Sequence, residues 1–125
     1  MKYKTLVSVS CVVLLLSGFV VLAVPFWLLN LYDAALTAGG AVLARSFGAT
    51  YLALAVLAWA GRDAQELVIR KTVSVSLAIC FGLGFVIFAV SQWMGVFNIL
   101  GWLDIILNGS LTAGHIYFLS HPDKI

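Results

Sequence analysis

Four long apolar runs, separated by short polar stretches, occupy most of this 125-residue chain. They cover about residues 6–31, 41–60, 72–93 and 96–119. A helix needs about 20 apolar residues to cross the hydrocarbon core of a bilayer, and each run reaches that length. The pattern therefore predicts an all-α, polytopic membrane protein with four transmembrane helices in an antiparallel bundle. We expect a single domain over residues 1–125.

Helix breakers and aromatic residues mark the ends of these runs. Pro25 lies late in the first run, where it should kink or end the regular helix. Trp27 and Tyr32 follow it, at positions typical of aromatic residues at a membrane interface. Polar residues 61–66 separate the second run from the third, and a tight turn around Gly95 separates the third from the fourth.

The composition supports a membrane protein and argues against a soluble domain, a nucleic-acid partner and a metal site. Apolar residues make up 63% of the chain and charged residues 10%, against about 45–50% and about 25% in soluble domains. The net charge is only +2 and the basic residues lie mainly at run ends, so we expect no nucleic-acid partner. Cys11 and Cys80 fall inside apolar runs and predict small buried side chains. No spacing of cysteine or histidine indicates a metal site, and we predict no cofactor.

Basic residues predict the orientation. An even number of spans places both termini and the middle loop on one side of the membrane, and the loops of the opposite side contain no lysine or arginine. By the positive-inside rule, we expect a multi-pass protein of the bacterial inner membrane with both termini cytoplasmic. The alternative, that the first run is a cleaved signal peptide, is disfavoured by its long apolar stretch. The six basic residues on the predicted cytoplasmic side are Lys2, Lys4, Arg62, Arg70, Lys71 and Lys124.

Small residues spaced four apart predict where helices pack closely. In lipid, helices associate through van der Waals fit and polar contacts rather than through the hydrophobic effect. We expect these residues to form packing faces within the bundle, with dimerisation as the alternative. They are Gly40, Ala44 and Gly48 in the second run, and Ser74, Ala78 and Gly82 in the third.

Two charges lie well inside the runs, Arg45 in the second and Asp104 in the fourth. A charge within a membrane is costly and normally has a partner. At about 1.5 Å per residue, both lie on the order of 10 Å or less below the non-cytoplasmic surface. Their similar depth and opposite sign predict an ion pair. The alternative is a solvated Asp104, with Arg45 extended outward to the interface.

The fourth run also carries a polar stripe within about 80° of one helix face. Lipid cannot satisfy these groups, so the stripe should face protein or water. We expect interhelical hydrogen bonds to serine and threonine on the first and third runs. A cleft that binds a headgroup, a quinone or a small solute is one alternative, and a face for a partner subunit is the other. The stripe consists of Gly101, Asp104, Asn108, Thr112 and His115.

The sequence gives little support for a catalytic site. His115 has no second histidine within a run to complete a bis-histidine haem site, although one histidine could ligate a chlorophyll-type pigment. Ser110, His115 and Asp104 supply the residue types of a hydrolase, but without a nucleophile elbow. The first run lacks the acidic residue that small multidrug transporters require. We therefore expect a protein that is not an enzyme.

Several short motifs carry a family resemblance. The second run opens with Ala44-Arg45-Ser46-Phe47-Gly48-Ala49 and closes with Trp59 to Arg62, and the fourth opens with Asn98-Ile99-Leu100-Gly101-Trp102. Pro25 lies late in the first run, and the fourth ends with His115-Ile116-Tyr117-Phe118-Leu119. With these motifs the chain resembles small bacterial four-helix membrane proteins that are DoxX-like. The resemblance covers most of the chain and implies a fold but no common activity.

The predicted function follows from the short loops, which leave little surface outside the bilayer. We expect an integral membrane accessory or scaffold subunit of a larger assembly, without its own catalysis. Its partners would be membrane lipids and either other membrane subunits or a second copy. The alternative is binding or transport of a lipid, quinone or small solute in an intramembrane cleft formed by Arg45, Asp104, Asn108 and His115.

Overall fold

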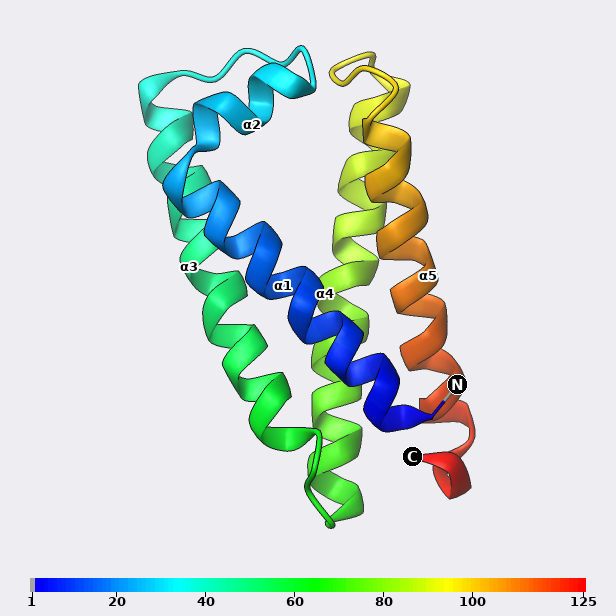
Figure 1. The fold of residues 1–125 in the computed structure, drawn as a ribbon. Helices are drawn as coiled ribbons and strands as arrows, with labels where there is room; N and C mark the ends of the chain where they lie inside the picture. The colour runs from blue at the N-terminus through cyan, green and yellow to red at the C-terminus, as the bar shows by residue number, and fades with distance from the viewer. Residues whose placement is uncertain (1) are drawn as a thin grey trace.

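The computed structural model describes residues 2–125, apart from the side chain of Lys124. This part of the chain forms five α-helices and a short 3₁₀ helix, with no strand. Both termini and the α3–α4 turn lie at one end of the molecule, and α2 lies at the other (Figure 1). The elements are α1 (Tyr3–Ala23), α2 (Pro25–Leu31), α3 (Ala38–Gly61), α4 (Leu67–Trp93), α5 (Gly101–Ser120) and η1 (Pro122–Lys124).

The first apolar run is two helices rather than one. Val24 adopts φ −135° and ψ 54°, which ends α1, and Pro25 then occupies the first turn of α2. Proline has no N–H to donate to the preceding turn, and it disfavours a helical conformation at the residue before it. The predicted span 6–31 is therefore corrected to a membrane-length helix that ends at Ala23 and a short helix that bends across the end of the molecule (Figure 1).

Within residues 2–125, three helices, α1, α3 and α4, are long and apolar enough to cross a membrane. The fourth predicted run, 96–119, corresponds to α5, which begins only at Gly101. Residues before it form a turn in which Gly95 has φ +70°, a conformation that glycine adopts readily. α5 has 20 residues but is less apolar than the other three, because Asp104, Asn108 and His115 lie within it.

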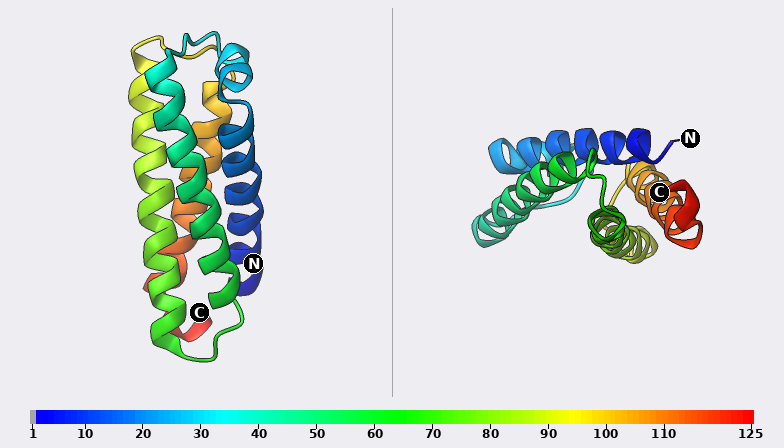
Figure 2. Two further views of the ribbon diagram at one scale, coloured as in Figure 1. Left: turned by 90° about the vertical axis from the view of Figure 1, so that its left-hand side faces the viewer. Right: turned by 90° about the horizontal axis from the view of Figure 1, so that it is seen from below.

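The helices associate as two antiparallel pairs. α1 packs along α3 and α4 packs along α5, whereas contacts between the pairs are fewer. α1 crosses obliquely, so that its C-terminal half lies on α3 while its N-terminal end approaches α5 (Figures 1 and 2). A Cβ atom on Gly48 would lie 2.7 Å from the carbonyl oxygen of Gly18. The absence of both side chains therefore permits the close approach of α1 and α3.

The residues of the two predicted packing faces occupy different environments. Gly48 contacts α1, Ser74 is fully buried against α5, and a Cβ atom on Gly82 would contact Thr112 at 3.5 Å. Ala44 and Ala78 are half-buried. Gly40 faces its own first turn, where its N–H donates to the Thr37 hydroxyl at 3.1 Å and completes the N-cap of α3.

Candidate functional site

His115 is the centre of a fully buried polar cluster from three helices. Its Nε2 lies 2.9 Å from the hydroxyl of Ser10 on α1, and its Nδ1 lies 3.4 Å from the hydroxyl of Ser74 on α4. All three side chains have 0% exposure. The ring of Phe81 stacks on the imidazole at a centroid distance of 6.4 Å. Of the five stripe residues, only His115 forms the interhelical hydrogen bonds to serines of the first and third runs that the sequence led us to expect, and these bonds join α1 to the α4–α5 pair.

The cluster uses both nitrogens of the histidine. A neutral imidazole has one donor and one acceptor nitrogen, and a serine hydroxyl can satisfy either. A metal or pigment ligated by His115 would therefore displace one of the two serines from a buried site. Ser110 is exposed and contacts neither His115 nor Asp104 by a hydrogen bond, so the three residues do not assemble as a catalytic triad.

The middle of the stripe is bonded within its own helix. The amide of Asn108 donates to the main-chain oxygen of Asp104 at 2.8 Å, and the hydroxyl of Thr112 donates to the main-chain oxygen of Asn108 at 2.7 Å. Both side chains are half-buried against α4, where Gly84 and Gly82 make room for them. These groups therefore satisfy their hydrogen bonds without a ligand.

Asp104 is bound by a tyrosine that the sequence did not indicate. The hydroxyl of Tyr32, just after α2, donates to the Asp104 carboxylate at 2.5 Å. Burial raises the pKa of Tyr32, and the carboxylate raises it further, so the phenol stays a neutral donor. The Tyr32 ring also packs edge-on against Phe97 at a centroid distance of 5.4 Å.

Asn98 reinforces the same end of the molecule. Its side-chain amide donates to the main-chain oxygen of Leu31 at 2.7 Å and to the Asp33 carboxylate at 3.0 Å. Its main-chain N–H donates to the oxygen of Tyr32 at 3.1 Å. Asp33 itself has φ 55°, a left-handed conformation that aspartate tolerates better than most residues. These bonds tie the turn after α2 to the α4–α5 turn.

The predicted Arg45–Asp104 ion pair does not form. Arg45 is exposed on α3, and the ion pairs among the described residues involve Lys4, Arg62 and Asp63 only. Similar depth was not enough to bring the two charges together, because α3 packs on α1 whereas α5 packs on α4. The alternative of a solvated Asp104 does not describe the structure either, since the half-buried Asp104 carboxylate accepts a hydrogen bond from Tyr32.

Replacing Tyr32 with phenylalanine should reveal which residue stabilises Asp104. A hydrogen bond to a charged group contributes about 1.5–3 kcal/mol, so Tyr32→Phe should lower the free energy of unfolding by about 2 kcal/mol. Arg45→Gln should change it by less than about 0.5 kcal/mol. Unfolding of the detergent-solubilised protein by increasing sodium dodecyl sulfate measures both values. A larger loss in Arg45→Gln than in Tyr32→Phe would restore the ion pair as the stabilising contact.

The opposite end carries the charged residues of the termini and of the α3–α4 turn. The Asp63 carboxylate is paired with Lys4 and accepts a hydrogen bond from Nε of Arg62 at 2.9 Å. The Lys4 ammonium, and then the Arg62 guanidinium, hold the pKa of Asp63 below its usual range. This pair is solvent-exposed, with 59% of the Lys4 side chain and 52% of the Asp63 side chain accessible.

The sequence indicated serine and threonine of the first and third runs as partners of the polar stripe, but it did not single out Ser10 and Ser74 as the partners of His115. It missed Tyr32 as the partner of Asp104. Tyr32 and Asn98 lie in turns far apart in sequence, and no periodicity links them. No group of three or more metal-ligating side chains is assembled among residues 2–125.

Comparison with known proteins does not assign the chain. It matches no family model, no curated protein and no solved structure. The resemblance to DoxX-like proteins therefore stays a prediction.

Proposed function

We propose that this chain is an integral membrane accessory or scaffold subunit without its own catalysis. α5 would form the fourth span, and both termini would face the cytoplasm. One observation carries the proposal: the polar side chains of the α5 stripe are bonded to residues of this chain, whereas the outward surface is mainly apolar. The exposed apolar side chains include Phe19 at 66%, Phe47 at 63% and Ile106 at 63% exposure.

Arg45 adds support for a protein partner. It is exposed on α3 within the predicted membrane region, two positions from Phe47, and its side chain has no hydrogen bond or ion pair with any described residue. An arginine within the membrane normally faces protein, water or the interface. A neighbouring subunit with a carboxylate at this depth would supply the missing partner.

An apolar hollow between α3 and α4 offers a second contact region. Its volume is about 440 Å³, and its lining includes Leu54, Leu57, Val73 and Leu77. Contacts between the two helix pairs are few here, so the monomer leaves apolar side chains of both pairs accessible. A helix of another subunit or a lipid chain could fill this space.

The alternative, a ligand in an intramembrane polar cleft, has weaker support. None of the five stripe residues lines the α3–α4 hollow or the larger pocket at the terminal end. Both ring nitrogens of His115 contact serine hydroxyls, those of Ser10 and Ser74, and the Asp104 carboxylate accepts a hydrogen bond from Tyr32. A ligand would have to displace these contacts.

Native mass spectrometry of the protein purified in mild detergent from its own membrane tests the proposal. We expect a reproducible additional subunit mass, and we expect Arg45→Gln to reduce its occupancy at least several-fold. Lys71→Gln is the matched control, because it removes the same charge at the terminal end. A lone chain that retains a quinone or small solute would favour the ligand-binding alternative instead.

A further inference from the structure

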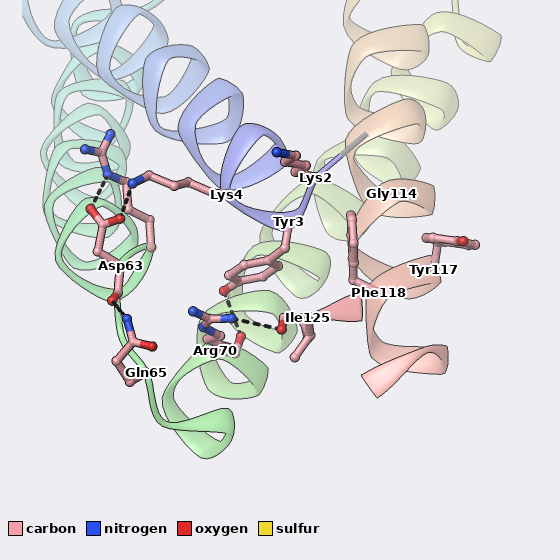
Figure 3. A pocket seen from close by; sticks show the side chains of 11 residues that line it. Lys2, Tyr3, Lys4, Asp63, Gln65, Arg70, Gly114, Tyr117, Phe118 and Ile125 are labelled. Atoms are coloured by element: carbon pink, nitrogen blue, oxygen red, sulfur yellow. Dashed lines mark hydrogen bonds and ion pairs between the residues drawn. The ribbon is translucent and has the colours of Figure 1, made fainter. Parts of the chain in front are cut away.

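A basic pocket lies at the end of the molecule that holds both termini. Its volume is about 780 Å³, within the range of about 300–1,000 Å³ typical of small-molecule sites. Four basic side chains line it, Lys2, Lys4, Arg62 and Arg70, against one acidic side chain, that of Asp63, and the Ile125 oxygen that Arg70 binds. Figure 3 labels Lys2, Lys4, Asp63 and Arg70. The lining therefore carries an excess of positive charge.

Neighbouring carboxylates do not neutralise all of the positive charge in this pocket. Asp63 is shared by Lys4 and Arg62, so one carboxylate offsets two cations. Lys2 is exposed, and its ammonium group makes no hydrogen bond or ion pair with the described residues. An anion that enters the pocket would therefore find an ammonium group that no other residue uses.

Arg70 is held in place by its neighbours. Its Nε donates to the main-chain oxygen of Ala64 at 2.5 Å, and its Nη1 donates to that of Ile125 at 2.9 Å. Its guanidinium lies over the ring of Tyr3 at 5.7 Å, and the Tyr3 hydroxyl donates to the main-chain oxygen of Arg70 at 3.0 Å (Figure 3). A guanidinium has five N–H donors, so it can hold this position and still donate to an anion.

The location favours a phosphate that belongs to a lipid. The pocket lies at the ends of three membrane-length helices, which is the level of the headgroups in a bilayer that these helices would span. The α3–α4 turn borders both this pocket and the apolar α3–α4 hollow: Arg62 and Asp63 line the first, and Gly61 and Ala64 line the second. Basic pockets between spans on the cytoplasmic side are known to hold anionic headgroups.

We propose that the pocket formed by Lys2, Lys4, Arg62 and Arg70 binds the phosphate of an anionic phospholipid. Lysine supplies a point charge and arginine a planar fork of donors, and both suit phosphate oxygens. The site does not depend on the proposed accessory role, since a lone chain or a complex could bind the same lipid. A soluble phosphate ester offers the same chemistry, and the experiment separates the two sources.

The test measures lipid retention by native mass spectrometry. Full-length protein, delipidated in detergent, is incubated with equal amounts of phosphatidylglycerol and phosphatidylcholine, with or without glycerol 3-phosphate. We expect selective retention of phosphatidylglycerol that glycerol 3-phosphate does not displace. One basic residue near a membrane surface changes lipid affinity by about fivefold, so Lys2→Gln should weaken retention by about that factor, and Lys2→Gln with Arg62→Gln by more.

Lys71→Gln is the matched control. Lys71 lies at the same end of the molecule but does not line the pocket, so its variant should retain phosphatidylglycerol within about twofold of the unmodified protein. Equal losses in Lys71→Gln and Lys2→Gln, or equal retention of the two lipids, would overturn the proposal. Binding of glycerol 3-phosphate itself, lost in Lys2→Gln, would show a phosphate site but overturn its assignment to a lipid. Thermal unfolding of each variant verifies that the fold is intact.

Discussion

Gly48→Ala is expected to separate α1 from α3 and to lower the free energy of unfolding by about 1–3 kcal/mol. The added methyl would lie 2.7 Å from the carbonyl oxygen of Gly18 and 2.8 Å from the amide nitrogen of Leu22. Both are main-chain atoms, so no side-chain rotation can relieve the overlap. Unfolding by increasing sodium dodecyl sulfate, followed by circular dichroism, measures the change.

Gly39→Ala is the control for this prediction. Gly39 lies on the same helix, and a Cβ atom there would have no neighbour within 4 Å. Alanine is a better helix former than glycine by about 1 kcal/mol, so this variant should be as stable as the original or slightly more stable. Equal stability of Gly48→Ala and the unmodified protein would mean that α1 and α3 do not approach as closely as Gly18 and Gly48 indicate.

His115→Ala is expected to destabilise the protein by about 3 kcal/mol. The change leaves a cavity beneath Phe81, and truncating large buried side chains to alanine costs about 2–5 kcal/mol. It also leaves the buried hydroxyls of Ser10 and Ser74 without the imidazole, and hydrogen bonds between membrane helices contribute about 0.6 kcal/mol each. The same detergent titration measures the loss.

His121→Ala is the matched control, because it removes the same side chain from the half-buried residue after α5, where the ring stacks on Tyr117 at 4.5 Å and its side-chain hydrogen bond is to the Tyr117 main-chain oxygen. Its effect should stay within about 0.5 kcal/mol. Ser10→Ala and Ser74→Ala then separate the hydrogen bonds from the cavity, since each should cost about 1 kcal/mol or less. If His115→Ala unfolds like the His121→Ala control, the buried cluster does not stabilise the fold.

The helices were predictable to different degrees. The second and third runs, 41–60 and 72–93, lie within α3 and α4, because uninterrupted apolar residues favour helix over the whole run. The disruption at Pro25 was also predictable, since it follows from the missing N–H of one residue. The complete separation of α2 from α1 was not, because its direction depends on contacts with the α4–α5 turn through Tyr32 and Asn98.

The contacts of the polar residues were also predictable only in part. That His115 would need hydrogen-bond partners on other helices followed from the cost of an unsatisfied polar group in lipid. Its particular partners, Ser10 and Ser74, depended on the oblique crossing of α1. The ion pair of Arg45 and Asp104 was predicted from similar depth and opposite charge, and neither says which helices are neighbours.

The sequence by itself determined the class of this protein: an all-α chain with membrane-length apolar helices, basic residues grouped at one end, and polar groups that must be satisfied internally. These properties depend on composition and on spacing along one helix, so they can be read locally. Only the tertiary structure decided the pairing of α1 with α3 and of α4 with α5, the partners of His115 and Asp104, and the pocket that gathers Lys2, Arg62 and Arg70. Those features join residues that are distant in sequence. The apolar pattern allows several arrangements of the helices equally well, and close packing and buried hydrogen bonds select one of them.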